Sequence, residues 1–228
     1  MGVFALLSAA AALFTASTAA PAPWTLRGDT YLMLFRPGED RALFVHDELR
    51  EPAVADFVIA MFVDYRESPV GPYQELLFIP GTFEFGERRL PAVTKMYVSS
   101  EASAVNGRRN WGLPKELATF EVRQLADRRT RVLMRVGGRR AVELYFREGL
   151  IPVPLSSLLV PEELRTIGQK LDDKSFEFAP TTSGWLKAAA TLQAWSDPAF
   201  FPEISPEQMI ATLKFSSFEA VFPVATVY

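Results

Sequence analysis

The sequence predicts an α+β protein built mainly from antiparallel β-strands, folded as one curved sheet or closed barrel with short helices outside. The first observation behind this prediction is a series of short apolar and aromatic runs separated by turns that contain glycine or proline. The second is that helical patterns are few, and the 49% of hydrophobic residues are ample for a buried core. With 228 residues the chain fits one domain, which we place at residues 23–228 after an apolar leader at residues 1–22.

Four strands are expected in the first half of the chain. The runs Thr30–Phe35 and Tyr73–Ile79 are short, apolar and aromatic, and Val54–Tyr65 is a longer buried run. The turn Ser68–Pro72 separates Val54–Tyr65 from Tyr73–Ile79, so we expect these two strands to pair as a hairpin. Residues Ala92–Val98 form the fourth strand, since their polarity alternates.

A short helix is expected over Ser100–Asn110, with Ser99 or Ser100 as its N-cap. Several strands follow, and Gly137 and Gly138 predict a tight hairpin between two of them. These later strands are expected at residues 120–124, 131–136, 141–146, 176–178, 185–195 and 214–227. The mixture of prolines and aliphatic residues at 150–159 predicts a segment that covers a barrel mouth or makes a subunit contact.

The leader has some features of a signal peptide. Residues Met1–Ala20 are alanine-rich and uncharged, and they end in small residues. However, no lysine or arginine precedes the apolar stretch, and alanine and serine make it a poor membrane anchor. We therefore expect a cytoplasmic protein with a helical or disordered leader, while export and membrane attachment remain open.

Composition excludes several classes of function. A formal net charge of −3 and a pI near 5.4 argue against nucleic-acid binding. The chain has no cysteine, which removes thiolate metal sites and cysteine nucleophiles. His46 is the only histidine, and we interpret it as a surface or structural residue at the end of a strand. One histidine among scattered carboxylates offers no metal-ligand spacing, so no metal is expected.

The most informative segment is Asn106–Ala118, which places Lys115 among apolar and conformationally restricted residues. Gly112 allows the backbone to turn, and Pro114 biases the residue before it toward extended geometry. The surrounding apolar residues would desolvate the Lys115 amine, and desolvation lowers a lysine pKa. A free amine near neutral pH can attack a carbonyl group and form a Schiff base.

Three motifs in the first half of the chain resemble the acetoacetate decarboxylase family. Residues Gly107–Leu117 match the family's Gly-Arg-x(4)-Pro-Lys-Lys-Leu segment, with Lys115 at the Schiff-base lysine. Gly71–Glu75 is similar to the segment that supplies a pocket carboxylate, and Tyr97–Ala102 to the strand-to-helix passage before the lysine. The order and spacing of the motifs agree over about Trp24–Val122, and the resemblance is weak beyond that range.

The resemblance implies a cone-shaped β-barrel with short peripheral helices and an interior pocket into which Lys115 points. It also implies a carbon–carbon lyase in which Lys115 forms a Schiff base with a keto acid or ketone, without metal or organic cofactor. Decarboxylation, aldol, dehydration and cyclisation reactions share this intermediate, and specialised metabolism is one setting for them. The alternative is a non-catalytic barrel of the same fold that binds a small ligand.

Two departures from the family pattern bear on the reaction. Glu116 stands where the family's decarboxylases have a second lysine, although adjacent side chains of an extended segment point to opposite faces. The family's second pocket glutamate aligns with Val58, and the nearest acid is Asp56. The family's pocket arginine is represented by Arg27, in a register displaced by about one residue. These differences favour a keto acid larger than acetoacetate.

The resemblance and the residues together give two sets of candidates. Lys115 and Glu75 are the catalytic candidates, Lys115 as nucleophile and Glu75 as a general acid or base or as a clamp for the substrate. The structural alternatives are a surface lysine after a proline turn and a solvent-facing strand glutamate. The substrate-binding candidates are Arg27, Tyr73, Tyr97, Arg108, Trp111 and Leu113.

A homo-oligomer is also expected, because barrels of this family commonly assemble. The aromatic residues at the C-terminus would suit a subunit interface, and strand alternation equally allows them to fill the core. They are Phe215, Phe218, Phe222 and Tyr228.

Overall fold

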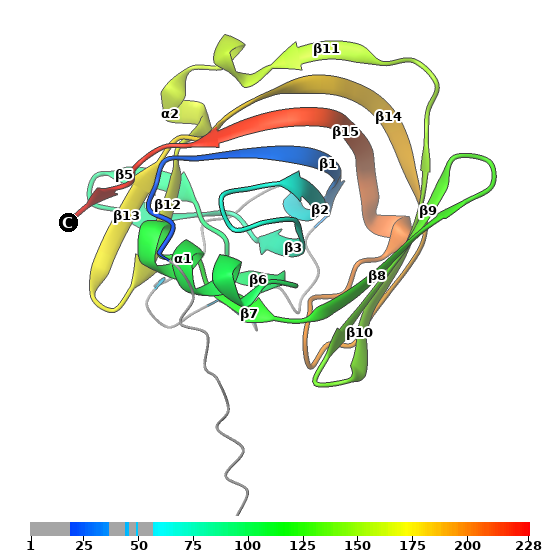
Figure 1. Ribbon diagram of the computed structural model, residues 1–228, viewed down its shortest axis with the longest axis horizontal. Coiled ribbons are helices and arrows are strands. Elements are labelled where there is room, and N and C mark those ends of the chain that lie inside the picture. Colours follow the sequence, from blue (N-terminus) through cyan, green and yellow to red (C-terminus); the bar gives the residue numbers. More distant parts are fainter. Residues whose placement is uncertain (1–18, 37–43, 46–48, 50–56) are drawn as a thin grey trace, which may run out of the picture.

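The computed structural model describes residues 19–36, 44–45, 49 and 57–228, so residues 1–18, His46 and Asp56 lie outside the described part. An eleven-stranded sheet dominates the molecule (Figure 1), in the order β7, β6, β3, β2, β1, β15, β14, β10, β9, β8, with β11 paired to β14. Only β6 and β7 pair in parallel among these neighbours. The strands are β1 (Trp24–Phe35), β2 (Val58–Glu67), β3 (Tyr73–Ile79), β6 (Lys95–Val98), β7 (Lys115–Leu117), β8 (Thr119–Leu125), β9 (Arg129–Val136), β10 (Arg139–Glu148), β11 (Val153–Ser156), β14 (Thr181–Ser196) and β15 (Met209–Phe222).

Smaller elements complete the fold. Two small sheets contain β4 (Thr82–Phe85) with β5 (Arg88–Pro91), and β12 (Ile167–Leu171) with β13 (Lys174–Phe178) and β16 (Thr226–Val227). The α-helices are α1 (Glu101–Trp111) and α2 (Glu162–Arg165), and single 3₁₀ turns lie at Ser157–Leu159 and Pro206–Gln208. Across the described residues, no helix has the length and apolar character that crossing a membrane requires. The sheet curls into a nearly closed barrel, which confirms the predicted mainly antiparallel β fold.

The strongest local signals in the sequence predict their elements well. β3 has the expected bounds and pairs with β2 in the expected hairpin, with Tyr73 opposite Tyr65. Gly137 and Gly138 have φ of 55° and 80° and join β9 to β10 in the tight turn expected of them. The sequence patterns do not predict β4, β5 or β12, because these strands are short and lack a sustained apolar alternation.

Alternate residues of the central strands face opposite sides of the large sheet. In β1, Tyr31 and Met33 belong to one buried cluster, whereas Thr30 and Leu32 between them line a cavity on the opposite side. This separation follows from the two-residue period of an extended strand. The two sides are built differently, and only one of them contains the cavity.

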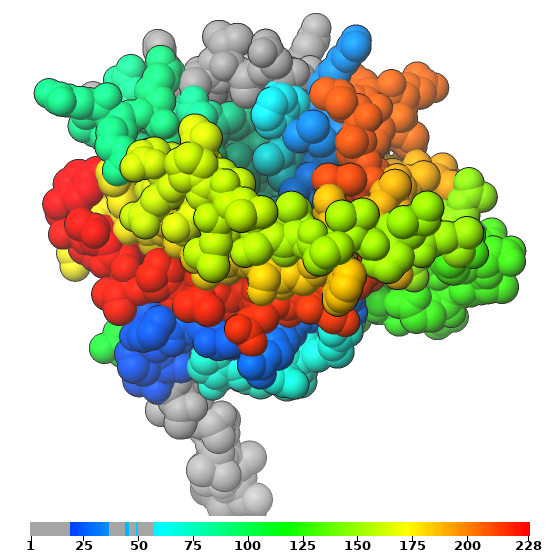
Figure 2. All heavy atoms as spheres, turned by 90° about the horizontal axis from the view of Figure 1, so that it is seen from above, coloured from blue at the N-terminus to red at the C-terminus, as the bar shows by residue number. Residues whose placement is uncertain are grey.

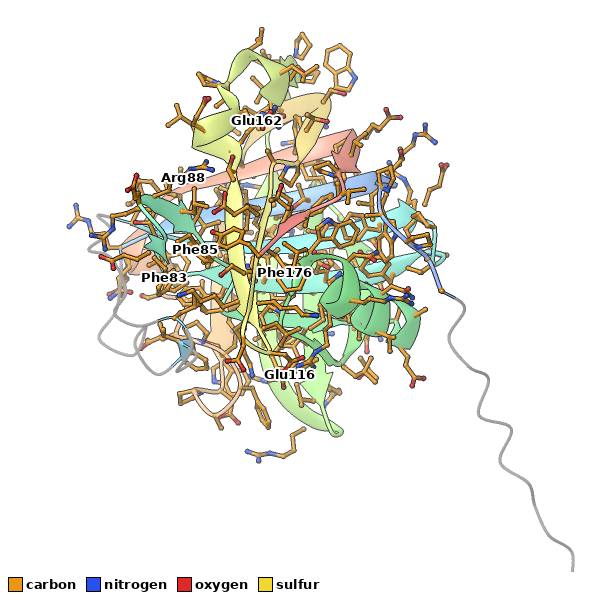
Figure 3. All side chains as sticks on the ribbon, turned by 90° about the vertical axis from the view of Figure 1, so that its left-hand side faces the viewer. Phe83, Phe85, Arg88, Glu116, Glu162 and Phe176 are labelled. Carbon is orange, nitrogen blue, oxygen red and sulfur yellow. The ribbon has the colours of Figure 1, made fainter. Side chains whose placement is uncertain are left out.

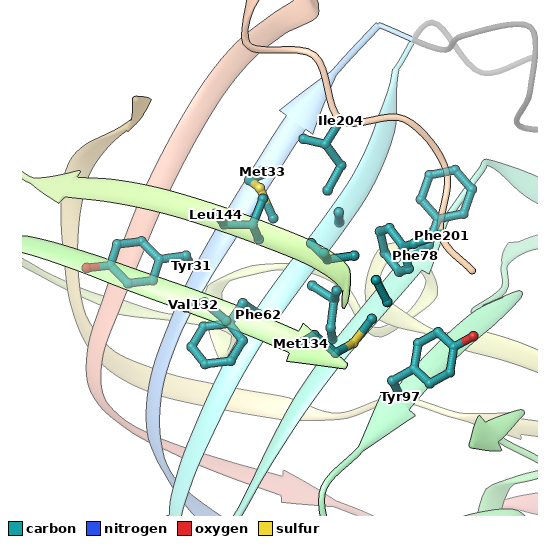
Figure 4. Close-up of a cluster of buried hydrophobic side chains, with 14 of the residues drawn as sticks. Tyr31, Met33, Phe62, Phe78, Tyr97, Val132, Met134, Leu144, Phe201 and Ile204 are labelled. Atoms are coloured by element: carbon teal, nitrogen blue, oxygen red, sulfur yellow. The ribbon is translucent and has the colours of Figure 1, made fainter. Parts of the chain in front are cut away.

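The first apolar cluster lies between the central strands and the β9–β10 hairpin (Figure 4). It includes Tyr31, whose ring stacks on that of Phe146 with centroids 4.1 Å apart. The ammonium group of Lys214 lies 4.2 Å from the centroid of the Tyr31 ring, and burial lowers the pKa of this lysine. Tightly packed aromatic and aliphatic side chains fill this side of the sheet.

Helix α1 and the β12–β13 ribbon cover the opposite side of the sheet (Figure 3). Ser100 caps α1, because its hydroxyl accepts a hydrogen bond from the amide of Ser103 at 3.2 Å. Gly112 ends the helix with a φ of 64°, and a Cβ atom at this position would lie 2.6 Å from the Phe176 ring of β13. The helix terminus therefore requires glycine both for its backbone conformation and for its contact with β13.

The segment after β10 contributes β11, which pairs with β14 and lies toward the viewer in Figure 2. Leu155 of this segment lines the cavity, and covering of a barrel mouth by the whole segment stays a prediction. Several aliphatic side chains beside it are exposed, among them Ile151 and Leu159 at 78% and 82%. A subunit contact and a homo-oligomer remain predictions.

The C-terminal aromatic residues occupy two environments. Phe215, Phe218 and Phe222 line the cavity, which agrees with the alternative that they fill the interior. Tyr228 is 58% exposed.

Loss of the α1 cap should cost measurable stability. We expect Ser100→Ala to lower the free energy of unfolding by about 1 kcal/mol, because an amide of the first turn loses its acceptor. Ser100→Asp keeps an acceptor and should stay close to the parent protein. Urea unfolding followed by circular dichroism measures both, and equal stabilities of the two variants would contradict the role of the cap.

Candidate functional site

Helix α1 returns the chain to β7 at the edge of the large sheet, and this places Lys115 on the side of the sheet that α1 covers. β7 pairs in parallel with β6, and Lys115 lies opposite Met96. The connection through α1 is a short strand-helix-strand crossover, and the turn after Gly112 leads directly into β7. Adjacent residues of β7 then alternate, so Lys115 is 3% exposed whereas the side chain of Glu116 is 46% exposed.

A buried ion pair holds the Lys115 amine. Its Nζ atom lies 3.0 Å from Oε2 of Glu75 and 3.0 Å from Oγ of Ser103. Both members of the ion pair have side chains that are 3% exposed. Removing two charges from water is costly, so the pair is stable only because each member compensates the other and further hydrogen bonds complete the arrangement.

Two tyrosines complete the surroundings of the pair. The hydroxyl of Tyr65 donates to Oε1 of Glu75 at 3.3 Å, and Lys115 Nζ lies 5.2 Å from the centroid of the Tyr73 ring. Burial raises the pKa of both tyrosines well above the usual value, and the charge of Glu75 raises them further. Both phenols therefore stay protonated at ordinary pH, so the Tyr65 hydroxyl can donate its hydrogen bond to the Glu75 carboxylate.

An apolar cavity of about 370 Å³ adjoins this group. Glu75 lines the cavity together with Tyr65, Met96 and Leu113, and the same four residues line a smaller void beside Lys115. The Glu75 carboxylate thus stands where the lysine environment meets the larger cavity. In the described part of the chain, no cluster of histidine, aspartate or glutamate side chains has a geometry that could hold a metal ion.

Five of the eight candidate residues meet around the amine. Trp111 and Leu113 line the smaller void beside Lys115, and the Trp111 indole donates to the carbonyl of Pro223 at 2.7 Å. Trp111 also meets Trp24 edge to face with centroids 5.1 Å apart, which closes this end of the site to water. The five are Lys115, Glu75, Tyr73, Trp111 and Leu113.

Three candidates lie away from the cavity. Arg27 is on the outer face of β1, where its guanidinium pairs with Glu67 at 2.8 Å and with Glu219 at 2.6 Å. Tyr97 belongs to the first apolar cluster, on the opposite side of the sheet from Lys115. Arg108 is exposed on α1 and donates to the backbone carbonyl of Lys115 at 3.3 Å. The structure therefore gives no support to substrate contacts by these three residues.

The two departures from the family pattern also have definite positions. Glu116 lies outside the site and pairs with Lys95 at 2.6 Å, as the alternation of an extended segment implies. Val58 is buried in the first apolar cluster, so it faces away from the cavity. Asp56 lies outside the described residues.

Sequence reasoning missed three residues that contact the pair. Ser103 and Gly107 are four residues apart, and this spacing places both on the face of α1 that meets Lys115. A Cβ atom at Gly107 would lie 2.7 Å from Cδ and Cε of Lys115, so glycine leaves the space that the lysine side chain occupies. No local sequence pattern points to Tyr65. Its place in the site follows from the register of the β2–β3 hairpin, which places it opposite Tyr73.

These features define a class of protein: a curled β-sheet with a lysine and a carboxylate paired at one end of an apolar cavity. The chain belongs to the acetoacetate decarboxylase (ADC) family, whose model matches residues 47–199. No curated protein sequence gives a significant match.

Solved structures share the fold at low sequence identity. Acetoacetate decarboxylase from Legionella pneumophila subsp. pneumophila str. Philadelphia 1 is 12% identical, with a TM-score of 0.67 over 100% of this chain and 98% of that one. The enduracididine biosynthesis enzyme MppR, solved in complex with pyruvate, is 16% identical, with a TM-score of 0.60 over 91% of each chain. An acetoacetate decarboxylase-like enzyme from Sphingomonas wittichii RW1 is 14% identical, with a TM-score of 0.61 over 92% of this chain and 94% of that one.

Removing one member of the buried pair should be far more costly than removing both. We expect Lys115→Ala to lower the free energy of unfolding by about 3–5 kcal/mol, because the Glu75 carboxylate is left buried without its cation. The double variant Lys115→Met with Glu75→Leu should recover most of this loss. Chemical denaturation measures the three proteins.

The matched control for this prediction is the partly exposed pair of Lys95 and Glu116, whose side chains are 18% and 46% exposed. Lys95→Ala should change stability by no more than about 1 kcal/mol, because the Glu116 carboxylate that is left behind stays in contact with water. A double variant as unstable as Lys115→Ala would show that the loss does not come from an uncompensated charge.

The space left by Gly107 yields a second prediction. Glycine to alanine inside a helix normally adds stability, but here the new methyl group would overlap the Lys115 side chain. We expect Gly107→Ala to reduce modification of Lys115 by a small amine-reactive aldehyde at least tenfold, measured by peptide mass mapping. Val105→Ala is the control on the same helix, because Val105 is 49% exposed and should leave the modification unchanged.

Proposed function

We propose that this protein is an acetoacetate-decarboxylase-like enzyme in which Lys115 forms a Schiff base with a keto acid or a ketone. The observation that carries the proposal is the buried pair of Lys115 and Glu75 at the end of an apolar cavity. A lysine enclosed in this way is removed from bulk water, and a carboxylate stands within hydrogen-bond distance to accept its proton. Family membership supports the proposal, because the resemblance to the family's decarboxylases implies a Schiff-base lysine at this position.

The bond changes require no further reactant. Glu75 first accepts one proton from the ammonium group, and the nitrogen lone pair of Lys115 forms a bond to the carbonyl carbon. The carbonyl oxygen receives protons and leaves as water, so a protonated lysine and a ketone give a protonated imine and water. Tyr65 supports this proton exchange by donating a hydrogen bond to the Glu75 carboxylate.

The protonated imine then serves as an electron sink for reactions at the neighbouring carbon. With a β-keto acid, the bond to the carboxylate breaks, carbon dioxide leaves and the electron pair moves to the imine nitrogen. With a ketone, a proton leaves the α carbon to Glu75, and the resulting enamine can add to an aldehyde. MppR has been solved in complex with the condensation product of pyruvate and imidazole 4-carboxaldehyde, so a protein of this fold can bind the product of a condensation.

A non-catalytic barrel that binds a small ligand is the competing function. In that case the ion pair of Lys115 with Glu75 is permanent and only closes one end of the cavity. The two functions differ in the reactivity of one amine, which can be measured directly.

Reductive trapping tests the proposal. The protein is incubated with β-keto acids, α-keto acids and ketones in the presence of cyanoborohydride, and adducts are measured by intact mass and peptide mapping. We expect one adduct, located at Lys115, and none at this position in the double variant Lys115→Met with Glu75→Leu. Lys214→Ala is the matched control, because Lys214 is also buried but lies on the opposite side of the sheet.

The opposite result would favour the binding barrel. It would consist of no adduct with any carbonyl compound in a folded protein, together with an affinity for apolar ligands that the double variant retains.

A further inference from the structure

The cavity extends away from Lys115 along one row of side chains. Register partners on successive strands lie side by side on the same face of a sheet. Five successive pairings connect β7 to β15 in this way. The row consists of Lys115, Met96, Leu77, Met61, Leu32 and Leu213.

The row gives the cavity a length that a small keto acid does not use. Met96 and the later members of the row line the cavity, and with neighbouring strands about 4.8 Å apart the four steps from Met96 to Leu213 extend about 19 Å along the curved sheet. The cavity volume of about 370 Å³ corresponds to about twelve groups the size of a water molecule. Acetoacetate has only seven non-hydrogen atoms and would leave the far end of the cavity unfilled.

The charged groups of the site, Lys115 and Glu75, lie at one end of the row. Among the described residues that line the cavity, Glu75 is the only carboxylate, and none is a lysine or an arginine. Arg27, the substrate-binding candidate that represents the family's pocket arginine, is on the outer face of the sheet. The Thr30 hydroxyl, which also lines the cavity, donates to the backbone carbonyl of Phe62 at 2.9 Å. An ionised group at the far end of the cavity would find no charged partner among these residues.

We infer that the carbonyl compound that reacts with Lys115 is a ketone or aldehyde with a long apolar tail and no ionised group. This inference rests on the proposed Schiff-base function and names its substrate class. The carbonyl carbon meets Nζ beside Glu75, and the tail follows the row toward Leu213. Imine formation releases one water molecule, and Glu75 exchanges the protons, so no carboxylate is needed on the substrate.

A homologous series of methyl ketones tests the inference. Acetone, 2-hexanone, 2-octanone and 2-decanone are each trapped with cyanoborohydride at equal concentration, and the rate of adduct formation at Lys115 is measured by mass spectrometry. Each methylene group buried in the cavity should raise the apparent affinity about fourfold until the cavity is full. Acetoacetate and pyruvate are included as the short charged acids.

One pair of compounds isolates the effect of charge. 7-Oxooctanoate is 2-octanone with its terminal methyl group replaced by a carboxylate, so the two have almost the same length. We expect 7-oxooctanoate to react at least a hundredfold more slowly, because its carboxylate would enter an apolar region without a partner.

Two variants test where the tail lies. The variants are the single substitutions Leu213→Trp and Leu186→Trp. Each fills part of the cavity far from Lys115, because both leucines line it. Each should slow trapping of 2-decanone at least tenfold and leave trapping of acetone unchanged. Ile210→Trp is the matched control, because Ile210 is on the same strand as Leu213 but is 51% exposed. Thermal unfolding and near-ultraviolet circular dichroism verify that each variant is folded.

The outcomes separate the inference from the proposed function. A Lys115 adduct that increases with chain length and is suppressed by a terminal carboxylate supports both. A Lys115 adduct that forms equally well or better with acetoacetate, pyruvate or 7-oxooctanoate overturns the inference and leaves the Schiff-base function standing. Folded cavity variants that trap 2-decanone as fast as Ile210→Trp also overturn it, and no adduct with any compound overturns both.

Discussion

The cross-strand register of β7, β6, β3, β2, β1 and β15 determines the arrangement of the site. Because each strand alternates with a period of two, one continuous register aligns Lys115 with the apolar side chains that lead to Leu213. The next row on the same face carries Glu75 opposite Val63, so the carboxylate comes to lie beside the amine. A shift of one residue in any of these pairings would turn the site toward the first apolar cluster.

The buried pair also explains why the site is polar at only one end. Lys115 and Glu75 are removed from water, and their mutual attraction is completed by Ser103 and Tyr65. The cavity beyond them is lined mainly by aliphatic and aromatic side chains. A chemically active group at the end of an apolar channel fixes the orientation of a ligand, because only its polar atom can approach the amine.

The sequence predicts the positions that local chemistry determines. The proline turn before Lys115, the left-handed glycine at Gly112 and the hairpin that carries Glu75 all leave local signals, and the structure contains each of them. Arg27 and Tyr97 show the limit of this reasoning. A residue type alone does not reveal which face of a strand it occupies, and a register displaced by one residue moves the side chain to the opposite face.

The sequence by itself determined the family, the mainly antiparallel β fold and the segment that holds the amine, because these depend on local patterns of turn residues and apolar runs. Only the tertiary structure decided that Ser103, Gly107 and Tyr65 surround the pair and that Arg27 lies outside it. It also decided the length and the apolar character of the cavity. The physical reason is that these properties arise from strands and a helix distant in the chain, whose register and packing no local pattern specifies.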